Sequence, residues 1–536
     1  MMSWLGEPKA IWIETDSHWK AMVIKDERWE APGVELWLRE NQNGTGLAVS
    51  APQLPLKRLR LCWNHPLGNV AGLRILGDHW ERAYGDLEWR GIHPERVLPW
   101  YFLMTQGASS QAVGVMTGAG AFCSWQVNGE QIVFTADLRC GDSGVLLKDR
   151  VLEVATLVGR TGRSGQSAFS LATEFCVALC PRPLLPKGPI VGGNNWYYAY
   201  GRSDHEKILA DSRFIAELAD GHATRPFMVI DDGWQLTSGG GSCNGGPWVG
   251  NRLFPDMARL AEEMKQTGVR PGIWFRPLLA SQNVPDEWIR FRRPGGQAVL
   301  DPSVPAVGEY VAQTIRDLSA WGYDMIKHDF STFDVLGRWG FQMGGEVNSV
   351  AQPLADRSRT TAEILVDFYR TIQEASGKSL ILGCNTVGHL AAGLVEIQRT
   401  GDDTSGRSWE RTRRMGINTL SHRMPQHNTF FCADADCVGV TDQVPWELNR
   451  QWLELLSRSS TALFVSAEPS QVTAIQKQDL KVAFQTALQG HPPAEPLDWM
   501  ETTCPTHWQL GGEVQTFSWN HRGTPGLGEQ DNEWWL

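Results

Sequence analysis

The chain of 536 residues lacks several features that mark common classes of protein. No stretch reaches the roughly 18 uninterrupted apolar residues that a bilayer span requires. The opening segment carries charges throughout and lacks the apolar core and cleavage site of a secretory signal. Positive charge is in deficit, with 49 Lys and Arg against 60 Asp and Glu, so nucleic-acid phosphates would mainly be repelled. We therefore expect a cytoplasmic protein that binds neither a membrane nor nucleic acid.

Signatures of metal, phosphate and disulfide sites are also missing. The ten cysteines are scattered, and the closest pairs, Cys176 with Cys180 and Cys432 with Cys437, do not repeat at zinc-ligand spacing. An HExxH motif is absent, and the glycine-rich stretch 238–246 lacks the Lys-Ser/Thr ending of a phosphate-binding loop. We expect reduced thiols, no metal and no cofactor, and a loop over 238–246.

What the sequence does contain is an ordinary globular composition with an excess of tryptophan. Apolar residues make up 42% and charged residues 20%, which is typical of a soluble chain large enough to bury a core. The 25 Trp residues are compatible with carbohydrate binding, because indole faces cover the apolar faces of sugar rings. A large core uses tryptophan equally well, so this count alone does not decide the function.

Hydrophobic patterning divides the chain at a proline-rich joint over residues 181–189. Before the joint, strand-like runs are separated by Gly, Asn and Pro and show little helical periodicity. These runs include 34–40, 57–63, 131–140 and 151–158. The pattern predicts an N-terminal all-β domain over residues 1–186, which ends where the prolines of the joint prevent regular strand pairing.

After the joint, eight short apolar runs alternate with amphipathic helices, which is the pattern of parallel βα units. The predicted strands are 188–195, 225–232, 270–277, 323–330, 379–386, 394–403, 427–436 and 461–469. Eight units match a (β/α)8 TIM barrel, here over residues 187–487. The helix over 203–220 is predicted to start with a capping box formed by Ser203 and Glu206. Residues 488–536 are predicted to form a small C-terminal β segment, so the fold class is α/β.

Acidic residues end four of the predicted strands, at the edge where TIM barrels hold their reacting groups. They are Asp231 and Asp232, Asp329, Asp402 and Asp403, and Asp434 and Asp436. Converging carboxylates favour either a divalent metal site or a glycosidase. Lys327 lies on the same side of its strand as Asp329, and Arg399 precedes the acids of the sixth strand. A metal site seldom includes such cations, so we favour the glycosidase.

Glycoside cleavage needs an ionised carboxylate near the anomeric carbon and a protonated carboxyl group at the leaving oxygen. Lys327 favours the ionised form of Asp329, which suits a nucleophile. Crowding of Asp402 against Asp403 is expected to raise the pKa of the acid.

Other polar residues receive a structural interpretation. Asp256 and Asp334 are expected to serve in helix caps or turns, which is the usual role of Asp at βα junctions. His389, His422 and His427 are expected to be structural histidines, since the sequence shows no partner for them.

Eight motifs in order along the barrel resemble the α-galactosidase clan, glycoside hydrolase families 27 and 36. They are GGNNWYYAYG (192–201), VIDDGWQ (229–235), NRLFPDM (251–257), RPGIWFRP (270–277), YDMIKHDF (323–330), LGCNT (382–386), QRTGDDT (398–404) and ADADC (433–437). The N-terminal domain is similar to the β-sandwich that precedes the family 36 barrel, although it is shorter.

The resemblance implies roles for individual residues. Asp329 corresponds to the catalytic nucleophile, and Asp403, rather than Asp402, to the general acid/base. The substrate-binding residues that it implies, together with residues at neighbouring strand ends, are Trp196, Asp231, Asp232, Trp234, Arg276, Lys327, Cys384, Asn385, Arg399 and Asp436. Two departures border the sugar pocket: His328 and Phe330-Ser331 flank the nucleophile where family 36 carries Trp and Met-Asn, and Asn385 stands where some galactosidases carry an acid.

The resulting hypothesis is a retaining, exo-acting α-glycosidase, with an α-galactosidase as the first choice and an oligosaccharide or glycoside as its partner. Two alternatives stay open. One is a transglycosylase similar to the raffinose synthases of family 36, and the other is a non-catalytic sugar-binding protein on the same barrel. The sequence is also compatible with a homo-oligomer.

Overall fold

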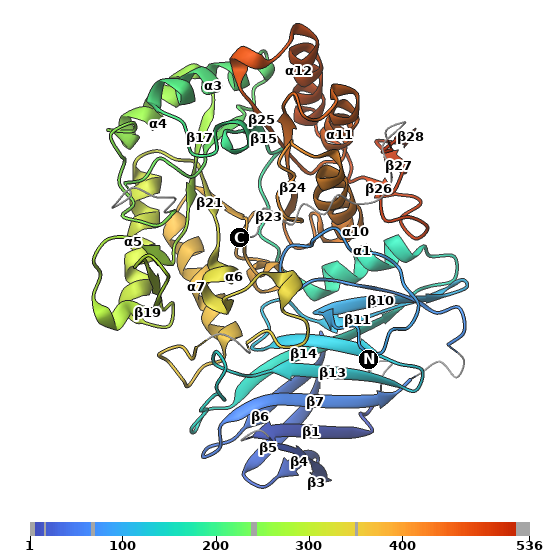
Figure 1. Cartoon of the computed structure of the whole chain (residues 1–536). Helices are drawn as coiled ribbons and strands as arrows, with labels where there is room; N and C mark the ends of the chain where they lie inside the picture. Colours follow the sequence, from blue (N-terminus) through green and yellow to red (C-terminus); the bar gives the residue numbers. More distant parts are fainter. Residues whose placement is uncertain (1–5, 16–17, 66–69, 237–243, 349–351, 521–536) are drawn as a thin grey trace.

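The computed structural model describes residues 6–15, 18–65, 70–236, 244–348 and 352–520 (Figure 1). Most of the glycine-rich stretch 238–246 and the end of the predicted C-terminal segment, 521–536, lie outside the described residues. Figure 1 shows N-terminal β-sheets at one end of the molecule and a barrel of alternating strands and helices at the other.

The N-terminal domain consists of two antiparallel sheets. The six-stranded sheet contains, in spatial order, β2 (His18–Ala21), β1 (Ala10–Thr15), β7 (Leu56–Asn64), β13 (Gln131–Asp137), β12 (Phe122–Val127) and β9 (Leu98–Pro99). The eight-stranded sheet contains β3 (Val23–Lys25), β4 (Arg28–Ala31), β5 (Val34–Asn41), β6 (Gly44–Ser50), β14 (Leu152–Thr161), β11 (Ser109–Val115), β10 (Tyr101–Gln106) and β8 (Arg74–Gly77). Buried residues alternate along strands such as β13, where Ile132, Phe134 and Ala136 are buried, as expected for a sheet that packs one face inward.

One helix interrupts the region predicted to be all β. Helix α1 (Ala168–Leu179) begins at Ser167, whose side chain accepts a hydrogen bond from the Ser170 amide. Leu171, Phe175 and Leu179 recur at helical spacing and are buried, and the helix packs against β11 and β14. The expectation of an all-β domain was therefore incomplete, because a single amphipathic helix covers one of its sheets.

The barrel is closed by eight parallel strands, and all eight predicted strands are confirmed. They are β15 (Val191–Asn194), β16 (Phe227–Ile230), β17 (Arg270–Phe275), β21 (Met325–His328), β22 (Leu380–Gly383), β23 (Ile397–Arg399), β24 (Cys432–Val440) and β25 (Ala462–Ala467). Their central residues are buried on both faces, as parallel strands covered by helices must be.

Helices follow the barrel strands and carry their apolar faces inward. They are α2 (Trp196–Ala199), α3 (His205–Leu218), α4 (Met257–Thr267), α5 (Pro305–Ala320), α6 (Ser331–Leu336), α7 (Thr361–Ser376), α8 (Gly388–Ala391), α9 (Trp409–Arg411), the π-helix η3 (Thr412–Asn418), α10 (Thr419–Arg423), α11 (Trp446–Arg458) and α12 (Ala474–Leu488). Short 3-10 turns are η1 (Asp286–Trp288), η2 (Gly340–Gln342), η4 (Met424–Gln426) and η5 (Pro469–Gln471). Asp204, not the predicted Ser203, caps α3 by accepting from the Lys207 amide, and Asp256 caps α4 as expected.

Two small sheets complete the fold. Strands β18 (Leu279–Ala280), β19 (Ile289–Arg292) and β20 (Ala298–Leu300) form a three-stranded insertion between β17 and α5. Strands β26 (Glu495–Pro496), β27 (His507–Leu510) and β28 (Glu513–Thr516) form the predicted C-terminal β element, which lies beside α10 and α11 in Figure 1.

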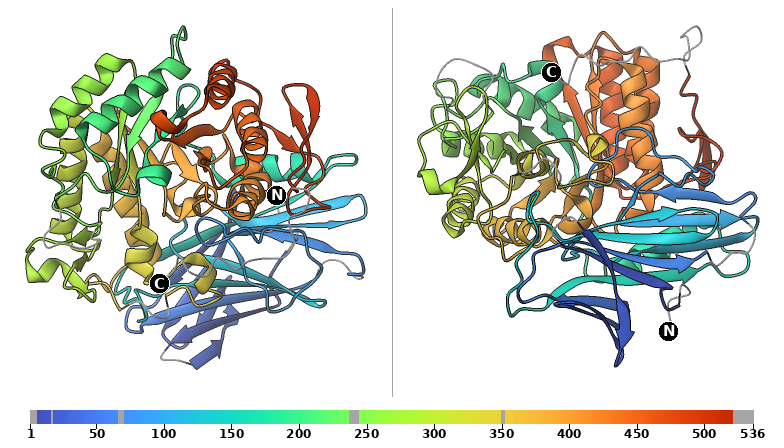
Figure 2. Two further views of the ribbon diagram at one scale, coloured as in Figure 1. Left: turned by 45° about the horizontal axis from the view of Figure 1, so that its top comes forward. Right: turned by 60° about the horizontal axis from the view of Figure 1, so that its bottom comes forward.

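The N-terminal domain reaches the mouth of the barrel through the segment between β8 and β9. The Ala83 amide donates to the Thr400 carbonyl oxygen at 2.9 Å, and the Asp402 amide donates to the Ala83 carbonyl oxygen at 3.1 Å. Both views of Figure 2 show the N-terminal sheets against one side of the barrel. The segment therefore extends the barrel's rim directly beside the acids that follow β23.

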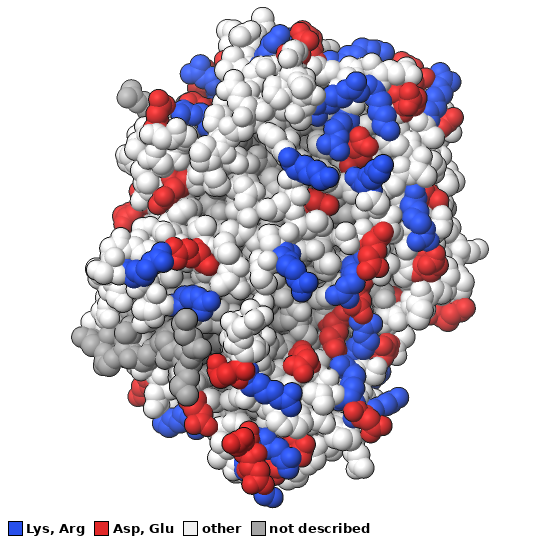
Figure 3. Space-filling view, turned by 180° about the vertical axis from the view of Figure 1, so that it is seen from behind, with Lys and Arg blue, Asp and Glu red and all other residues white. Residues whose placement is uncertain are grey.

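The described residues bear on three further expectations. No helix within the described ranges is long and apolar enough to cross a bilayer. On the face shown in Figure 3, acidic and basic side chains are mixed. The nine described cysteines are buried and free, as expected for reduced thiols.

Candidate active site

A pocket of about 440 Å³ opens at the carboxyl ends of the barrel strands. Six of the predicted site residues line it, namely Trp196, Asp231, Asp232, Lys327, Asp329 and Asp403. The other lining residues are Arg82, Tyr197, Tyr200, Asn244, Trp274, Arg293, Phe330, Phe333, Trp339, Asp402, Ser405 and Arg411. The acids come from three different strand ends, so only closure of the barrel brings them together.

Asp329 follows β21 and is held by uncharged donors. The Trp274 indole nitrogen donates to Oδ2 at 3.0 Å, and the Phe330 amide donates to Oδ1 at 2.8 Å. The Asp329 amide donates to the Phe275 carbonyl oxygen, which continues the pairing of β21 with β17. Phe330 adopts a left-handed backbone conformation with φ of 61°, which turns the chain sharply after the carboxylate. The carboxylate is thereby fixed in orientation while it borders the pocket.

Lys327 forms an ion pair with Asp231 and not with Asp329, although Asp329 is only two residues away in the sequence. Its Nζ donates to Asp231 Oδ2 at 2.7 Å, and the Asn194 side-chain amide donates to the same oxygen at 2.7 Å. Although burial favours the neutral amine, the charge of Asp231 outweighs it and raises the pKa of Lys327. Lys327 therefore stays charged, and its ion pair crosses from β21 to the end of β16.

Asp232, the neighbour of Asp231, is in a different environment. Burial raises the pKa of its carboxyl group to about 6, although a hydrogen bond from Gln235 opposes the shift. The Gln235 amide donates to Oδ1 at 2.6 Å. Oδ2 is thus the Asp232 oxygen available for a ligand in the pocket.

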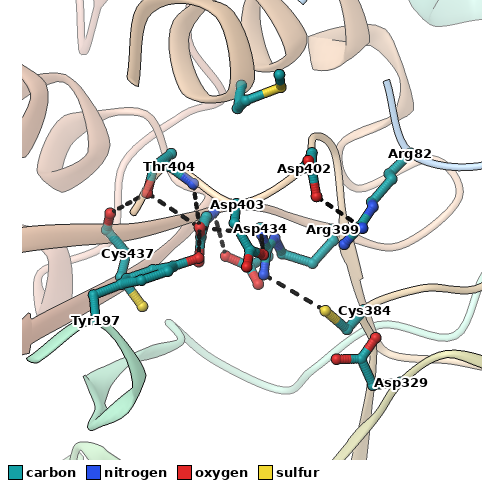
Figure 4. Close-up of polar contacts among 12 residues, drawn as sticks. Arg82, Tyr197, Asp329, Cys384, Arg399, Asp402, Asp403, Thr404, Asp434 and Cys437 are labelled. Carbon is teal, nitrogen blue, oxygen red and sulfur yellow. Dashed lines mark hydrogen bonds and ion pairs between the residues drawn. The ribbon is translucent and has the colours of Figure 1, made fainter. Parts of the chain in front are cut away.

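Asp402 and Asp403 are adjacent in sequence but have different partners. Asp402 is 2% exposed and is bound by Arg82 at 2.7 Å and by Arg411 at 2.8 Å. The Asp403 side chain is 38% exposed and is paired with Arg399 at 3.0 Å. Figure 4 shows Asp402 directed at Arg82, whereas Asp403 lies near Arg399. Asp403 is therefore the acid of this pair with access to a ligand.

The expected rise in the pKa of Asp403 is wrong, because its surroundings lower the pKa. Burial does favour the protonated acid, but Arg399, Arg82, Lys327 and Arg411 together outweigh it and lower the pKa of Asp403. Four cations around the carboxylate stabilise its charge more than the adjacent acid destabilises it.

Asp436 binds the same arginine as Asp403, Arg399. Its Oδ2 lies 3.0 Å from an Arg399 nitrogen and accepts from the Thr404 amide at 2.8 Å and from the Tyr197 hydroxyl. Asp436 itself is 3% exposed and has φ of 71°, so it faces Arg399 and not the pocket. It shares Arg399 with Asp403 and so orients that arginine.

Five further residues predicted to bind substrate lie behind the pocket wall. Trp234 is fully buried and donates to the Trp274 carbonyl oxygen at 3.0 Å. Arg399 and Cys384, each 1% exposed, contact each other at 3.6 Å. Asn385 is fully buried, and its Oδ1 accepts from the Phe333 amide at 3.1 Å.

Arg276 is the fifth, and its charge is already neutralised. It forms two hydrogen bonds with Asp334, at 2.9 and 2.6 Å, and each side chain is 1% exposed. Asp334 is thus a buried ion-pair partner and not the expected cap. Arg276 directly follows β17, and its guanidinium lies 4.2 Å from the centre of the Phe330 ring. The arginine therefore supports the pocket wall below Phe330.

The sequence did not lead us to three residues that line the pocket, namely Trp274, Arg82 and Trp339. Trp274 was detectable, because it lies next to the carboxyl end of β17, at the edge where TIM barrels hold their reacting groups. Arg82 was not, because it belongs to the N-terminal domain, far from any barrel motif. Trp339 lies in the loop after α6, where no periodicity indicates orientation.

The three histidines that were expected to be structural are buried. Burial lowers the pKa of His389, His422 and His427 to about 4, so each is neutral, which agrees with the structural interpretation. Within the described residues, no three His, Cys, Asp or Glu side chains are grouped so that they could hold a metal ion.

Comparison with solved structures shows which proteins share this fold. An α-galactosidase from Thermus thermophilus in complex with p-nitrophenyl α-D-galactopyranoside matches with a TM-score of 0.61 at 17% identity, covering 95% of this chain and 99% of that chain. A family 36 α-galactosidase, an AgaA variant from Geobacillus stearothermophilus in complex with 1-deoxygalactonojirimycin, matches with a TM-score of 0.58 at 16% identity, covering 87% and 68%. No family model matches the chain. The fold implied by the sequence resemblance, that of family 36 α-galactosidases, is therefore confirmed.

Proposed function

We propose that the protein is a retaining, exo-acting α-glycosidase that hydrolyses terminal α-galactosyl residues. The observation that carries this proposal is that Asp329 and Asp403 line one pocket in unlike environments. Asp329 is held by two neutral donors, and Asp403 is partly exposed beside Arg399. Two carboxyl groups with different roles are what glycoside cleavage requires.

In the first step, Asp329 attacks the anomeric carbon while protonated Asp403 donates its proton to the leaving oxygen. The Trp274 and Phe330 donors hold the attacking carboxylate in place and disperse its charge. In the second step, ionised Asp403 accepts a proton from water, which attacks the anomeric carbon and releases the sugar from Asp329. No cofactor enters this mechanism.

The inner end of the pocket is suited to a sugar ring. Asp232 presents an acceptor oxygen, Lys327 and Asp231 form a charged wall, and Trp196 provides an aromatic surface. The related structures hold p-nitrophenyl α-galactoside or stachyose, which supports an α-galactoside as the substrate here.

Proton NMR of the first product tests the proposal. With p-nitrophenyl α-galactoside, a retaining enzyme releases the α-anomer first, which then equilibrates with the β-anomer. Retention also requires the Asp329 and Asp403 carboxyl groups to lie about 5 to 5.5 Å apart in a complex with bound substrate analogue. Initial release of the β-anomer would refute the retaining mechanism, and absence of turnover on any aryl α-glycoside would favour a sugar-binding protein.

The same reaction with an added acceptor sugar separates hydrolysis from transglycosylation. Free galactose as the main product supports the hydrolase. A new oligosaccharide that accumulates in place of free galactose would favour a transglycosylase.

A further inference from the structure

Glu81 is a buried carboxyl group of the N-terminal domain to which the proposed mechanism gives no role. It is 2% exposed and lies between β8 and β9. Its Oε1 accepts from the Gly340 amide at 2.7 Å and from the Tyr84 hydroxyl, and its Oε2 accepts from the Asn385 side-chain amide. Both oxygens are thus used, and two of the three donors belong to the barrel.

The contact with Gly340 allows no side chain at that position. A Cβ atom on Gly340 would lie 2.7 Å from Cγ of Glu81, which is closer than carbon atoms pack. The turn η2, which begins at Gly340, is therefore fitted to Glu81. This close fit fixes the position of the preceding residue, Trp339, which lines the pocket.

Arg82, the residue after Glu81, belongs to the same wall. Its guanidinium lies over the Trp339 ring at 5.0 Å and pairs with Asp402 at 2.7 Å. The Trp339 ring in turn lies 4.6 Å from the Phe333 ring. Glu81 is therefore linked to both members of the Arg82–Trp339 pair. It precedes Arg82 in the chain, and it binds the amide of Gly340, the residue that follows Trp339.

The proposed mechanism puts this wall on the leaving-group side of the pocket, because Arg82 pairs with Asp402. Asp402 is the neighbour of Asp403, the proposed acid that protonates the leaving oxygen. Arg82 and Trp339 both line the pocket, so the wall offers a guanidinium group beside an indole ring. A ring with an apolar face and an acceptor hydroxyl, such as a sugar, satisfies both groups.

We infer that Glu81 is a positioning residue that holds Trp339 and Arg82 in the pocket wall, so that the N-terminal domain selects a sugar as the leaving group. This inference rests on the proposed function and extends it, because it assigns leaving-group selectivity to a domain outside the barrel.

Two substrates with the same glycone separate positioning from general damage. α-Galactosyl fluoride has a leaving group of one atom, whereas raffinose has a sugar leaving group. Glu81→Ala should lower kcat/KM for raffinose at least about tenfold, mainly through KM, and change that for the fluoride less than about threefold. The control Glu88→Ala, a partly exposed residue in the same segment that pairs with the exposed Arg90, should leave both unchanged. A parallel loss on both substrates, or no loss on raffinose, would overturn the inference.

A polarity swap tests the hydrogen bond itself. Glu81→Gln places an NH2 group against the Asn385 amide, which cannot simply flip because its Oδ1 accepts from the Phe333 amide. Asn385→Asp restores an acceptor opposite that NH2 group. Each single variant should lose raffinose activity, and the double variant should recover to within about threefold of wild type. Losses that add in the double variant would contradict the contact.

Hydrogen exchange decides the positioning without any substrate. The Gly340 amide is protected by Glu81, so Glu81→Ala should speed exchange in peptides covering 338–343 relative to Glu88→Ala. Unchanged exchange there would show that Glu81 does not hold the turn. A wild-type protein that splits neither substrate would refute the proposed function, and with it the selectivity, whereas the exchange result would still decide whether Glu81 positions Trp339.

Discussion

Lys327 and Asp231 form a buried ion pair that joins two strands of the barrel, with Nζ 2.7 Å from Oδ2. The other oxygen of Asp231 accepts from the Asp232 amide at 2.9 Å, so Asp231 has few lone pairs left for a substrate. The free acceptor at this end of the pocket is Asp232. Asp231 and Asp232 therefore differ in how many acceptor positions they keep free, and this difference leads to a prediction about sugar specificity.

Asp232 is expected to discriminate galactose from glucose through the axial C4 hydroxyl. A buried carboxylate that loses this donor is left unpaired, which is costly. We expect wild type to prefer an α-galactoside over the matching α-glucoside at least about 100-fold in kcat/KM, or about 2.7 kcal/mol. Asp232→Asn should narrow that gap more than it lowers glucoside activity. Equal use of both sugars by wild type would reject the galactosidase proposal while leaving the retaining mechanism intact.

Asp329→Ala should abolish nearly all turnover, because the nucleophile is lost while its donors, Trp274 and the Phe330 amide, stay in place. Azide or formate should restore part of the activity on an aryl α-galactoside by entering the vacated space. The measurement is initial rate against anion concentration, with Asp334→Ala as a variant that no anion should rescue. A wild-type-like rate for Asp329→Ala would place the nucleophile elsewhere.

Asp402 and Asp403 should respond differently to the same substitution. Asp403→Asn should lower kcat/KM for raffinose by about 100-fold or more, because general acid catalysis is lost, and should destabilise the fold less than Asp402→Asn, because Asp403 is partly exposed. Asp402→Asn leaves Arg82 and Arg411 without their buried counter-charge and should cost about 3 to 5 kcal/mol of unfolding free energy. Urea denaturation and kinetics on both variants check this. A stable Asp402→Asn enzyme with lost acid catalysis would exchange the two roles.

The cations around Asp403 should determine how kcat/KM for raffinose depends on pH. Because they lower its pKa, the proton required for raffinose cleavage is held only at acidic pH, so kcat/KM should fall as pH rises towards neutrality. Arg82→Gln removes one of these cations, which raises the pKa and should move the alkaline limb of the profile to higher pH. The exposed Arg90→Gln should not move it.

α-Galactosyl fluoride provides the internal control, since fluoride leaves without a proton. Its kcat/KM profile should keep the same alkaline limb in wild type and in Arg82→Gln. A limb that shifts equally for fluoride and raffinose would mean that a group other than the acid is titrating.

The eight barrel strands and the acids that end them could be read from the sequence because both are local properties. An apolar run such as 225–232 that is followed by an amphipathic helix predicts a βα unit, and a residue at the carboxyl end of its strand must lie at the mouth once the barrel closes. The predicted roles of Asp329 and Asp403 used this rule, the neighbouring cations Lys327 and Arg399, and the motif resemblance. Helix α1 was not predicted, because the helical periodicity of one short amphipathic helix is weak in a strand-rich region.

Which charges meet was decided only by the tertiary structure. Lys327 is two residues from Asp329, yet it binds Asp231 of another strand; Arg276 binds Asp334; and Arg82, from another domain, binds Asp402. Sequence determined the inventory of acids and cations at the mouth of the barrel. Pairing depends on distances across a closed surface, and a buried charge takes whichever partner lies within hydrogen-bond reach. The protonation of Asp403 and the wall beside it follow from those pairings, so neither could be derived from residue order alone.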